Sequence, residues 1–508
     1  MTGTKTALLI GLACGLGLGL LWMQAASTES QDPFTLDVVD RAVFAPGLVD
    51  AEQAILDGLP GAALYRIDLD VPSSPRRIGV RERVEYTNAE DVALHEIYFH
   101  LHPNAAGGAI AFDELALDGT AIEPILAFDD HALRIPFDEP LIPGATTRID
   151  MAFELTVPDG YMVWGPFGYV DQLLSLDQFY PVIPVYDDEG WNIGHAPTMG
   201  DWSYYDLSFY IVRIEAPASW TIAATGSEID RKTSALRQSV TYAAGPVRDF
   251  YLAGGSRLEA VSATCGEVTV THYVPNWGVG QAYEGLSLAR EALEVFGRRF
   301  GPYPYTELDF VSTAMGGGGG MEYPGIIAMG HALYDPNAIV WGLPSIVMLA
   351  STVTHEMGHQ WFYNAVGSDQ IDEPWLDEGM AQYCVNAYYL DTQGEGSAAS
   401  YRRSWEERMN RIDGAELPIG LPSMAYDPGA YTPIIYGRAP MFIHELESYL
   451  DIEFFLRAYY EQHKWGIATT ESFLDLAQES SDQDLSELFD SWVLGDEVGP
   501  GTVLDTVP

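Results

Sequence analysis

Two histidines four residues apart, His355 and His359, constrain the fold of this chain more than any other feature of its sequence. Side chains at positions i and i+4 share one face of an α helix, so both imidazoles can bind one ion if the segment is helical. The flanking residues agree, because Pro344 suits a first helical turn and Gly367 suits the position after a helix end. We therefore predict a helix over residues 344–366 that carries two metal ligands.

A third ligand is needed, because a catalytic zinc is held by three protein groups and keeps one position open. Glu378 stands nineteen residues after His359, at the start of a second predicted helix over residues 376–390. A helix, a loop and a returning helix can bring its carboxylate to the ion. The alternative is a solvated acid at a helix N-terminus. We predict one zinc ion (Zn2+) per chain, held by His355, His359 and Glu378.

Glu356 follows the first histidine and projects from a different side of the same helix. It can therefore reach a water molecule on the zinc without binding the metal, and it is our candidate for the general base. A structural zinc would instead have four protein ligands, usually including cysteine. The pattern favours a catalytic site.

At these residues the chain resembles peptidase family M1, the gluzincins that include aminopeptidase N and leukotriene hydrolase. Residues 355–362 (HEMGHQWF) are similar to the family's HExxHxW(F/Y) block, and residues 375–379 (WLDEG) are similar to its WLNEG block, with Asp377 in place of Asn. The resemblance implies hydrolysis of peptide bonds. The matching blocks lie within about residues 62–493.

Two further blocks imply substrate contacts. Residues 319–323 (GGMEY) resemble the family's GxMEN motif, which implies that Glu322 binds the free α-amine of a peptide; Tyr323 stands in place of Asn. Tyr436 lies in a segment similar to the tyrosine block that supplies a hydrogen bond to the oxyanion, and Tyr431 is the alternative. Gln178 is a weaker candidate for an amine contact. The neighbouring substrate-binding candidates are Gly319, Gly320 and Met321.

The chain is expected to be an α+β multidomain protein. Alternating or apolar stretches of strand length recur at residues 64–71, 79–86, 94–101 and 209–216, and helical patterns dominate later. The small, polar residues 391–400 are predicted to form a loop. The resemblance implies an N-terminal antiparallel β domain followed by a thermolysin-like catalytic domain. It also implies a short form without the large C-terminal helical domain, which leaves the cleft more open.

We divide the chain into a signal peptide or membrane anchor, a β-rich domain, a catalytic domain and a C-terminal tail, over residues 1–30, 31–257, 258–495 and 496–508. Lys5 precedes an apolar run over residues 6–26, which is typical of a secretory signal and is also long enough for an anchor. Either alternative predicts an extracytoplasmic location, secreted or attached to a membrane.

The charge excludes one class of partner. With 25 basic and 73 acidic residues, the formal net charge is −48, which disfavours nucleic-acid binding. Such a surface is typical of an acidic extracellular protein or of one adapted to high salt. Apart from Cys14 in the leader, Cys265 and Cys384 are expected to be free thiols rather than a disulfide. The oligomeric state is not predicted by these features.

Three functions compete. The first is an aminopeptidase that removes N-terminal residues of peptide substrates, which a fixed carboxylate at Glu322 favours because it complements an α-ammonium group. The second is a zinc endopeptidase with an open cleft, and the third is a non-catalytic zinc-containing binding protein. A separate metal site at His100 and His102, which share one face of a predicted strand, is the less favoured alternative to simple packing.

Overall fold

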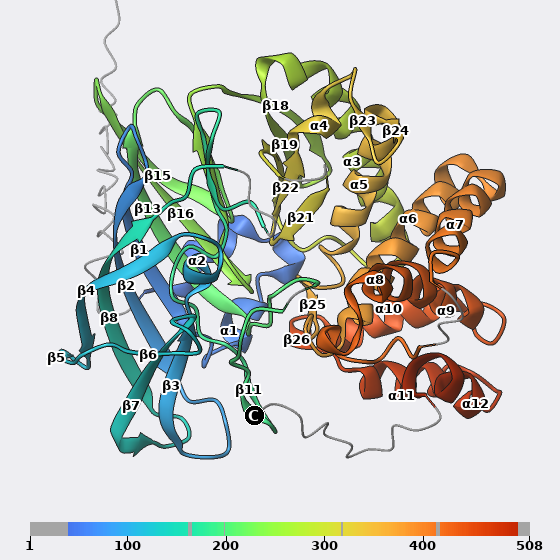
Figure 1. The fold of residues 1–508 in the computed structure, drawn as a ribbon, viewed down its shortest axis with the longest axis horizontal. Coiled ribbons are helices and arrows are strands. Elements are labelled where there is room, and N and C mark those ends of the chain that lie inside the picture. Colours follow the sequence, from blue (N-terminus) through green and yellow to red (C-terminus); the bar gives the residue numbers. More distant parts are fainter. Residues whose placement is uncertain (1–38, 161–164, 198, 316–318, 413–416, 496–508) are drawn as a thin grey trace, which may run out of the picture. The chain divides into compact units, whose positions relative to one another are not determined.

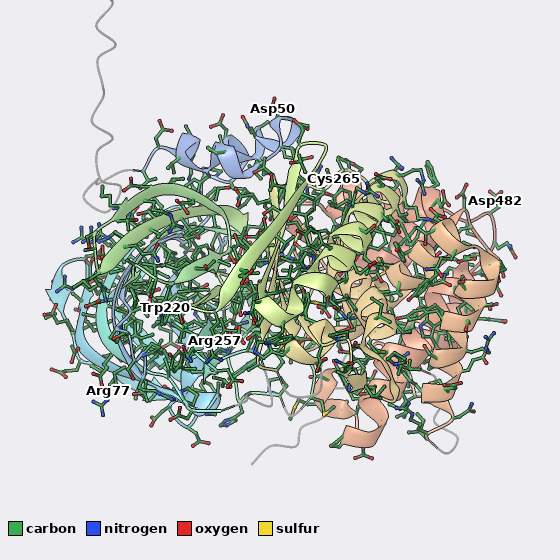
Figure 2. All side chains as sticks on the ribbon, turned by 90° about the horizontal axis from the view of Figure 1, so that it is seen from above. Asp50, Arg77, Trp220, Arg257, Cys265 and Asp482 are labelled. Atoms are coloured by element: carbon green, nitrogen blue, oxygen red, sulfur yellow. The ribbon has the colours of Figure 1, made fainter. Side chains whose placement is uncertain are left out.

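The computed structural model describes residues 39–160, 165–197, 199–315, 319–412 and 417–495 (Figure 1). From Asp40 onward the chain forms one compact unit, in which a β-rich N-terminal part precedes a largely helical part. Figure 2 shows the same division, with Arg77 among the strands and Asp482 among the helices. The predicted leader, the predicted tail and the first three glycines of the run at 316–320 lie outside the described residues. Within the described residues, no helix is both long and apolar enough to cross a bilayer.

The N-terminal part is built on an eight-stranded sheet. Three short helices come first: η1 (Arg41–Gly47), η2 (Asp50–Glu52) and α1 (Ile55–Gly58). Along β2 and β8 buried and exposed residues alternate, as expected for a sheet with one face against the core. The strands lie in the order β15 (Ser227–Thr233), β16 (Arg237–Val247), β13 (Ser208–Pro217), β1 (Leu64–Asp70), β2 (Arg77–Thr87), β8 (Thr146–Thr156), β4 (Ala109–Leu117) and β5 (Thr120–Ala121).

The predicted strands at 64–71, 79–86, 94–101 and 209–216 are confirmed, but the sheet is not wholly antiparallel. β1 and β13 pair in parallel, with Leu64 opposite Phe209. More than a hundred residues separate these two strands, so no hairpin turn forces them to run in opposite directions. The other strand pairs of this sheet are antiparallel.

Smaller sheets complete this part. One contains β3 (Leu94–His100), β7 (Ala132–Leu141) and β6 (Ile125–Ala127), and another contains β14 (Thr221–Ala224), β17 (Leu252–Gly255), β10 (Leu173–Leu176) and β9 (Gly168–Val170). The short helix α2 (His102–Ala105) follows β3, and β11 (Tyr186–Asp187) pairs with β12 (Gly190–Trp191). The predicted division at residue 257 falls between β17 and β18, which belong to different sheets.

The second part opens with a five-stranded sheet in the order β18 (Leu258–Cys265), β19 (Val268–Pro275), β20 (Glu307–Thr313), β22 (Ile326–Gly330) and β21 (Gly320–Tyr323). After η3 (Asn276–Gly278), helix α3 (Val279–Arg299) packs on β18 and β19. β21 is the last strand in the order and runs antiparallel to β22. One side of β21 is therefore a sheet edge, and Glu322 lies on that strand.

Helices fill the rest. After α4 (His331–Tyr334) and the hairpin of β23 (Ile339–Val340) and β24 (Leu343–Pro344) come α5 (Ser345–Gly358), β25 (Val366–Gly367), η5 (Pro374–Leu376) and α6 (Glu378–Gln393). The remaining elements, listed in chain order, are α7 (Glu395–Met409), η6 (Ser423–Ala425), α8 (Pro428–Pro433), η7 (Ile434–Arg438), α9 (Ala439–Leu446), α10 (Ile452–His463), β26 (Gly466–Ile467), α11 (Thr470–Glu479), α12 (Ser486–Phe489) and η8 (Asp490–Leu494).

Two sequence predictions were wrong here. The predicted helix over 344–366 ends at Gly358, because the chain turns through Tyr363, whose φ is 141°, and then forms β25, which pairs with β26. The predicted loop over 391–400 is instead the junction of two helices. Gly394, with φ of 82°, ends α6 and starts α7 at once, because glycine adopts this left-handed conformation without steric cost.

The remaining predictions for single residues have plain outcomes. Cys265 and Cys384 are free thiols, half-buried and buried respectively. His100 and His102 are buried and their rings stack 5.1 Å apart. Among the described residues, neither belongs to a group of side chains that could hold a metal ion. Nε2 of His100 lies 3.2 Å from the carbonyl oxygen of Asn192, and Nε2 of His102 contacts the hydroxyl of Tyr205.

Arg248, directly after β16, joins the two parts of the protein. Its buried guanidinium donates to the carbonyl oxygens of Tyr205 (2.9 Å), Tyr363 (2.7 Å) and Gly466 (2.5 Å). Tyr363 follows the histidine-bearing helix, so one side chain ties the β-rich part to the chain just beyond the predicted zinc ligands. Gly367 lies against the guanidinium, and a Cβ at this position would overlap with it.

We predict that Arg248→Met lowers the free energy of unfolding by about 2–4 kcal/mol, because several buried carbonyls lose a charge-assisted partner. Urea denaturation measures the change. The control is Arg257→Met, since Arg257 is exposed. A shift no larger than that of the control would mean that Arg248 does not hold the two parts together.

Candidate metal centre

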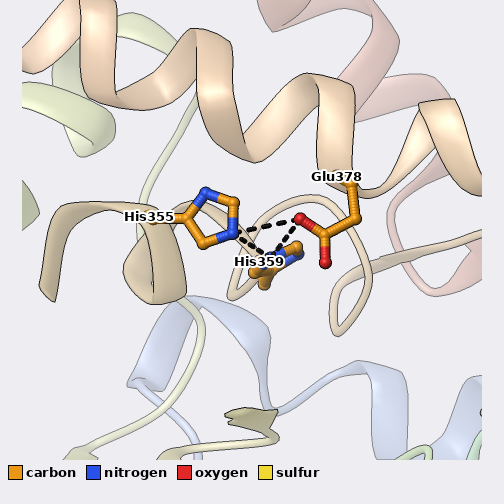
Figure 3. Close-up of side chains that lie close together, drawn as sticks. All are labelled: His355, His359 and Glu378. Atoms are coloured by element: carbon orange, nitrogen blue, oxygen red, sulfur yellow. Dashed lines mark hydrogen bonds and ion pairs between the residues drawn. The ribbon is translucent and has the colours of Figure 1, made fainter. Parts of the chain in front are cut away.

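Three side chains meet between α5 and α6 (Figure 3). The Nε2 atoms of His355 and His359 are 3.3 Å apart, and Oε2 of Glu378 lies 3.1 Å from the first and 3.8 Å from the second. Zinc binds such nitrogen and oxygen ligands at about 2.0–2.1 Å, so the corners of its tetrahedron are about 3.3 Å apart. Oε2 of Glu378 is also buried and accepts no hydrogen bond from any described residue. The three atoms have the spacing and chemistry of a zinc ligand set.

The other ring nitrogen of each histidine, Nδ1, lies close to a polar side chain. Nδ1 of His359 lies 2.5 Å from Oδ1 of Asp377, and both side chains are fully buried. Donation from Nδ1–H to the carboxylate leaves the Nε2 lone pair free for a metal. Burial by itself lowers the pKa of His359, but the carboxylates of Asp377 and Glu322 raise it well above its ordinary value. Nδ1 of His355 lies 3.3 Å from Nε2 of Gln382.

Gln370 connects two parts of the site. Its Nε2 donates to Oδ2 of Asp377 (2.6 Å) and to Oε1 of Glu322 (3.2 Å). Sequence reasoning missed this residue, because it lies in the loop between the two predicted helices rather than in a recognised block. The available signal was a run of polar residues, Ser368 to Gln370, directly after the turn at Gly367.

Glu356 points toward the edge strand β21. It is 4% exposed, and its Oε2 is buried with no partner in the described part of the chain. Burial raises its pKa to about 8, with His359 opposing the shift and Glu378 adding to it. A Cβ on Gly320 would overlap with the carboxylate of Glu356, so the glycine leaves room for Glu356 in this position.

The predicted substrate-binding residues share β21 and its start. Glu322 is 5% exposed, and burial, with help from Asp201, raises its pKa well above the usual range. Tyr323, which replaces the family's Asn, points to the opposite face, where its ring stacks 4.3 Å from Tyr251. Met321 packs against the same hydrophobic cluster. The replacement at 323 therefore changes the core behind the strand rather than the face that carries Glu322.

The β-rich part contributes a carboxylate that sequence reasoning missed. Single oxygens of Asp201, Asp377 and Glu378 lie within 4.8 Å of one another. Gly200, with φ of 82°, packs so closely on Tyr431 that a Cβ would overlap with its hydroxyl. Asp201 lies far from the zinc motif in sequence, so only the folded structure reveals this contact.

Both candidate tyrosines lie at the site. The hydroxyl of Tyr436 donates to Oε1 of Glu378 at 2.6 Å, and its ring lies 6.2 Å from that of His355. Tyr436 belongs to η7, one turn of π-helix of the kind that often marks functional sites. The Tyr431 hydroxyl is buried and has no partner among the described side chains. Both ends of the Gln178 amide, by contrast, are hydrogen-bonded within the β-rich part. Its Nε2 donates to the hydroxyl of Ser203 (2.5 Å), and its Oε1 accepts from the hydroxyl of Tyr205 (3.1 Å).

Residues 284–492 match the family model described as the Peptidase family M1 domain. The chain therefore contains a Peptidase family M1 domain over these residues. Aminopeptidase M1 of Arabidopsis thaliana is 25% identical over 457 residues, which cover 84% of this chain and 47% of that protein. Aminopeptidase 2 of Candida albicans is 26% identical over 235 residues, 43% of this chain and 25% of that protein. The chain thus spans between a quarter and about half of the length of these two curated relatives.

Solved M1 structures share the fold. An M1 zinc metallopeptidase mutant from Deinococcus radiodurans superimposes with a TM-score of 0.63 at 19% identity, covering 86% of this chain and 96% of that one. A two-domain M1 zinc metallopeptidase mutant bound to L-tryptophan gives the same score, identity and coverage. The predicted resemblance to the M1 family holds over residues 284–492, and the predicted fold class is confirmed. The roles of the individual site residues stay predictions.

We predict that Asp377→Ala lowers zinc affinity by about 10- to 100-fold, because His359 loses the partner that orients its ring. Competition with a chelator of known affinity measures the change directly, independently of activity. Asp377→Asn is the matched control, since its amide oxygen can still accept from His359. Equal affinity in all three proteins would contradict the assignment.

Proposed function

We propose that this chain is a zinc-dependent aminopeptidase with one zinc ion per chain, held by His355, His359 and Glu378. The observation that carries the proposal is the spacing of those three ligand atoms beside the unpartnered carboxylate of Glu356. A zinc ion bound there supplies Lewis acidity, which polarises a carbonyl and activates water. Glu356 takes the proton of the attacking water and later gives it to the leaving amine.

Glu322 fixes the register of the substrate in this proposal. Its buried carboxylate is complementary to an α-ammonium group and sits on the edge strand one position beyond Met321. Asp201 adds a second negative charge from the β-rich part. A peptide held by its first residue places its first peptide bond at the zinc, which makes the enzyme an exopeptidase.

Tyr436 is the proposed donor to the oxyanion, because its hydroxyl lies against a zinc ligand. Tyr431 is the alternative, since its hydroxyl is buried and unpartnered in the described part of the chain.

The printed names of similar proteins support this class of reaction. Relatives named Aminopeptidase M1 and Glutamyl aminopeptidase match the chain. A Deinococcus radiodurans structure is described as bound to a Tyr-Ser-Ala substrate, and a two-domain M1 zinc metallopeptidase mutant is described as bound to L-arginine. An endopeptidase with an open cleft is the second candidate and a non-catalytic zinc protein is the third. The buried carboxylate of Glu322 favours the aminopeptidase over both.

We also propose an extracytoplasmic location, secreted or anchored in a membrane. The support is Lys5 followed by the apolar run at residues 6–26.

We predict that Glu356→Gln keeps zinc but loses turnover, because the water loses its base while all three ligands remain. Metal analysis and an aminoacyl fluorogenic assay measure the two properties on the same sample. His359→Ala is the control and should lose both metal and activity. Normal activity of Glu356→Gln would overturn the proposed mechanism.

We predict that Glu322→Ala weakens hydrolysis of peptides with a free amine by about 10- to 100-fold, the worth of a charge-assisted pair. N-acetylated peptides of the same sequence should be poor substrates of both proteins. If the wild type cleaves blocked and free peptides equally well, the endopeptidase candidate is correct.

A further inference from the structure

An apolar hairpin stands beside the active-site edge strand. It consists of β23, β24 and the first turn of α5, residues 339–347, and Figure 1 shows it next to α4 and α5. Five of its large apolar side chains are exposed: Ile339 (66%), Trp341 (65%), Leu343 (48%), Ile346 (45%) and Val347 (46%). Such a concentration of exposed apolar groups typically marks a binding surface.

The backbone conformation of this hairpin turn is unfavourable for the tryptophan that occupies it. Trp341 and Gly342 have φ values of 48° and 86°. Two-residue hairpin turns with both φ values positive favour Asn or Asp followed by Gly, and a bulky residue is strained there. A tryptophan that is both strained and exposed calls for a role at the surface.

The hairpin tip lies next to the residues that would align a substrate. Trp341 Cη2 is 3.6 Å from the position that a Cβ on Gly319 would take. The next residue, Gly320, lies against Glu356, and Glu322 follows two residues later on the same strand. Along the short stretch from Gly319 to Glu322, Trp341 therefore lies beside the first residue and Glu356 beside the second, and the fourth is the proposed amine-binding carboxylate itself.

This order fixes the direction of a bound peptide. If its α-ammonium pairs with Glu322 and its first peptide bond reaches Glu356, the chain must run from residue 322 toward residue 319, antiparallel to β21. An extended chain advances about 3.3 Å per residue, so with the first peptide bond opposite Gly320 the second and third residues of the peptide lie on either side of Gly319. That is where Trp341 stands.

We propose that Trp341, supported by Ile339 and Leu343, is an apolar subsite for the third residue of the peptide, two positions beyond the amino-terminal one. This inference rests on the proposed aminopeptidase function and adds to it a preference for substrates with a large apolar third residue. Burying such a side chain against the indole favours these substrates by about 5- to 30-fold.

The test compares Ala-Ala-Leu-amide, Ala-Ala-Gly-amide and Ala-Ala-amide as substrates of the full zinc-loaded chain. The wild type should have a kcat/KM about 5- to 30-fold higher for the leucine peptide than for the glycine peptide. Trp341→Ala should abolish that ratio mainly through KM and leave Ala-Ala-amide, which has no third residue, unchanged. Trp341→Phe should keep most of the ratio.

Two further variants make the result decisive. Trp341→Gly suits the positive φ, so its folding is not in question, and it should behave as Trp341→Ala does. Phe454→Ala removes another exposed aromatic side chain, on α10, and should leave the ratio intact. The last measurement is binding of the wild type and of Trp341→Ala to neutral and anionic phospholipid vesicles. If Trp341→Ala reduces vesicle binding while the leucine-to-glycine ratio is unaltered, the hairpin is a membrane contact and the subsite is overturned.

Failure of the proposed aminopeptidase function can be distinguished from failure of the subsite alone. If the wild type hydrolyses none of the three peptides, the aminopeptidase proposal fails. If it hydrolyses all three and Trp341→Ala keeps the wild-type ratio, only the subsite fails.

Discussion

The site depends on a concentration of buried negative charge that needs cations to balance it. Carboxylates from four different segments converge there: Asp201, Glu322, Glu356, Asp377 and Glu378. Burial, reinforced by the neighbouring acids, raises the pKa of Asp201, Glu322, Glu356 and Glu378. Uncompensated charges of this kind cost several kcal/mol each in a protein interior. A divalent ion at the site would offset part of that cost, and an ammonium group would offset more.

The two parts of the fold are both needed to build this arrangement. The helical part supplies the ligand set and Glu356 from α5 and α6, but Asp201 and the wall at Gly200 come from the β-rich part. Arg248 holds the parts together at the segment that follows His359. Since the guanidinium bonds to backbone carbonyls, the tie does not depend on which side chains occupy those positions.

The sequence was most informative where function depends on local spacing. The convergence of His355, His359, Glu356 and Glu378 could be predicted because a helix places positions i and i+4 together and a short return brings Glu378 back to them. The end of α5 at Gly358, the abrupt join at Gly394 and the parallel pairing of β1 with β13 could not, because each is decided by contacts or by backbone geometry distant from the pattern itself. Asp201 and Gln370 were not identified from the sequence for the same reason, because tertiary structure alone brings each of them to the site.

The departure of Asp377 from the family's asparagine has a local explanation in Gln370. Oδ1 of Asp377 accepts from His359 and Oδ2 accepts from Gln370, whose nitrogen also bonds Glu322. An asparagine that accepted from His359 would turn its amide nitrogen toward the nitrogen of Gln370, so two donors would face each other. A carboxylate at 377 accepts from both neighbours and leaves Gln370 Nε2 a second hydrogen for Glu322. The residues at 370 and 377 therefore form a matched pair, which links His359 to Glu322, the side chain proposed to hold the substrate amine.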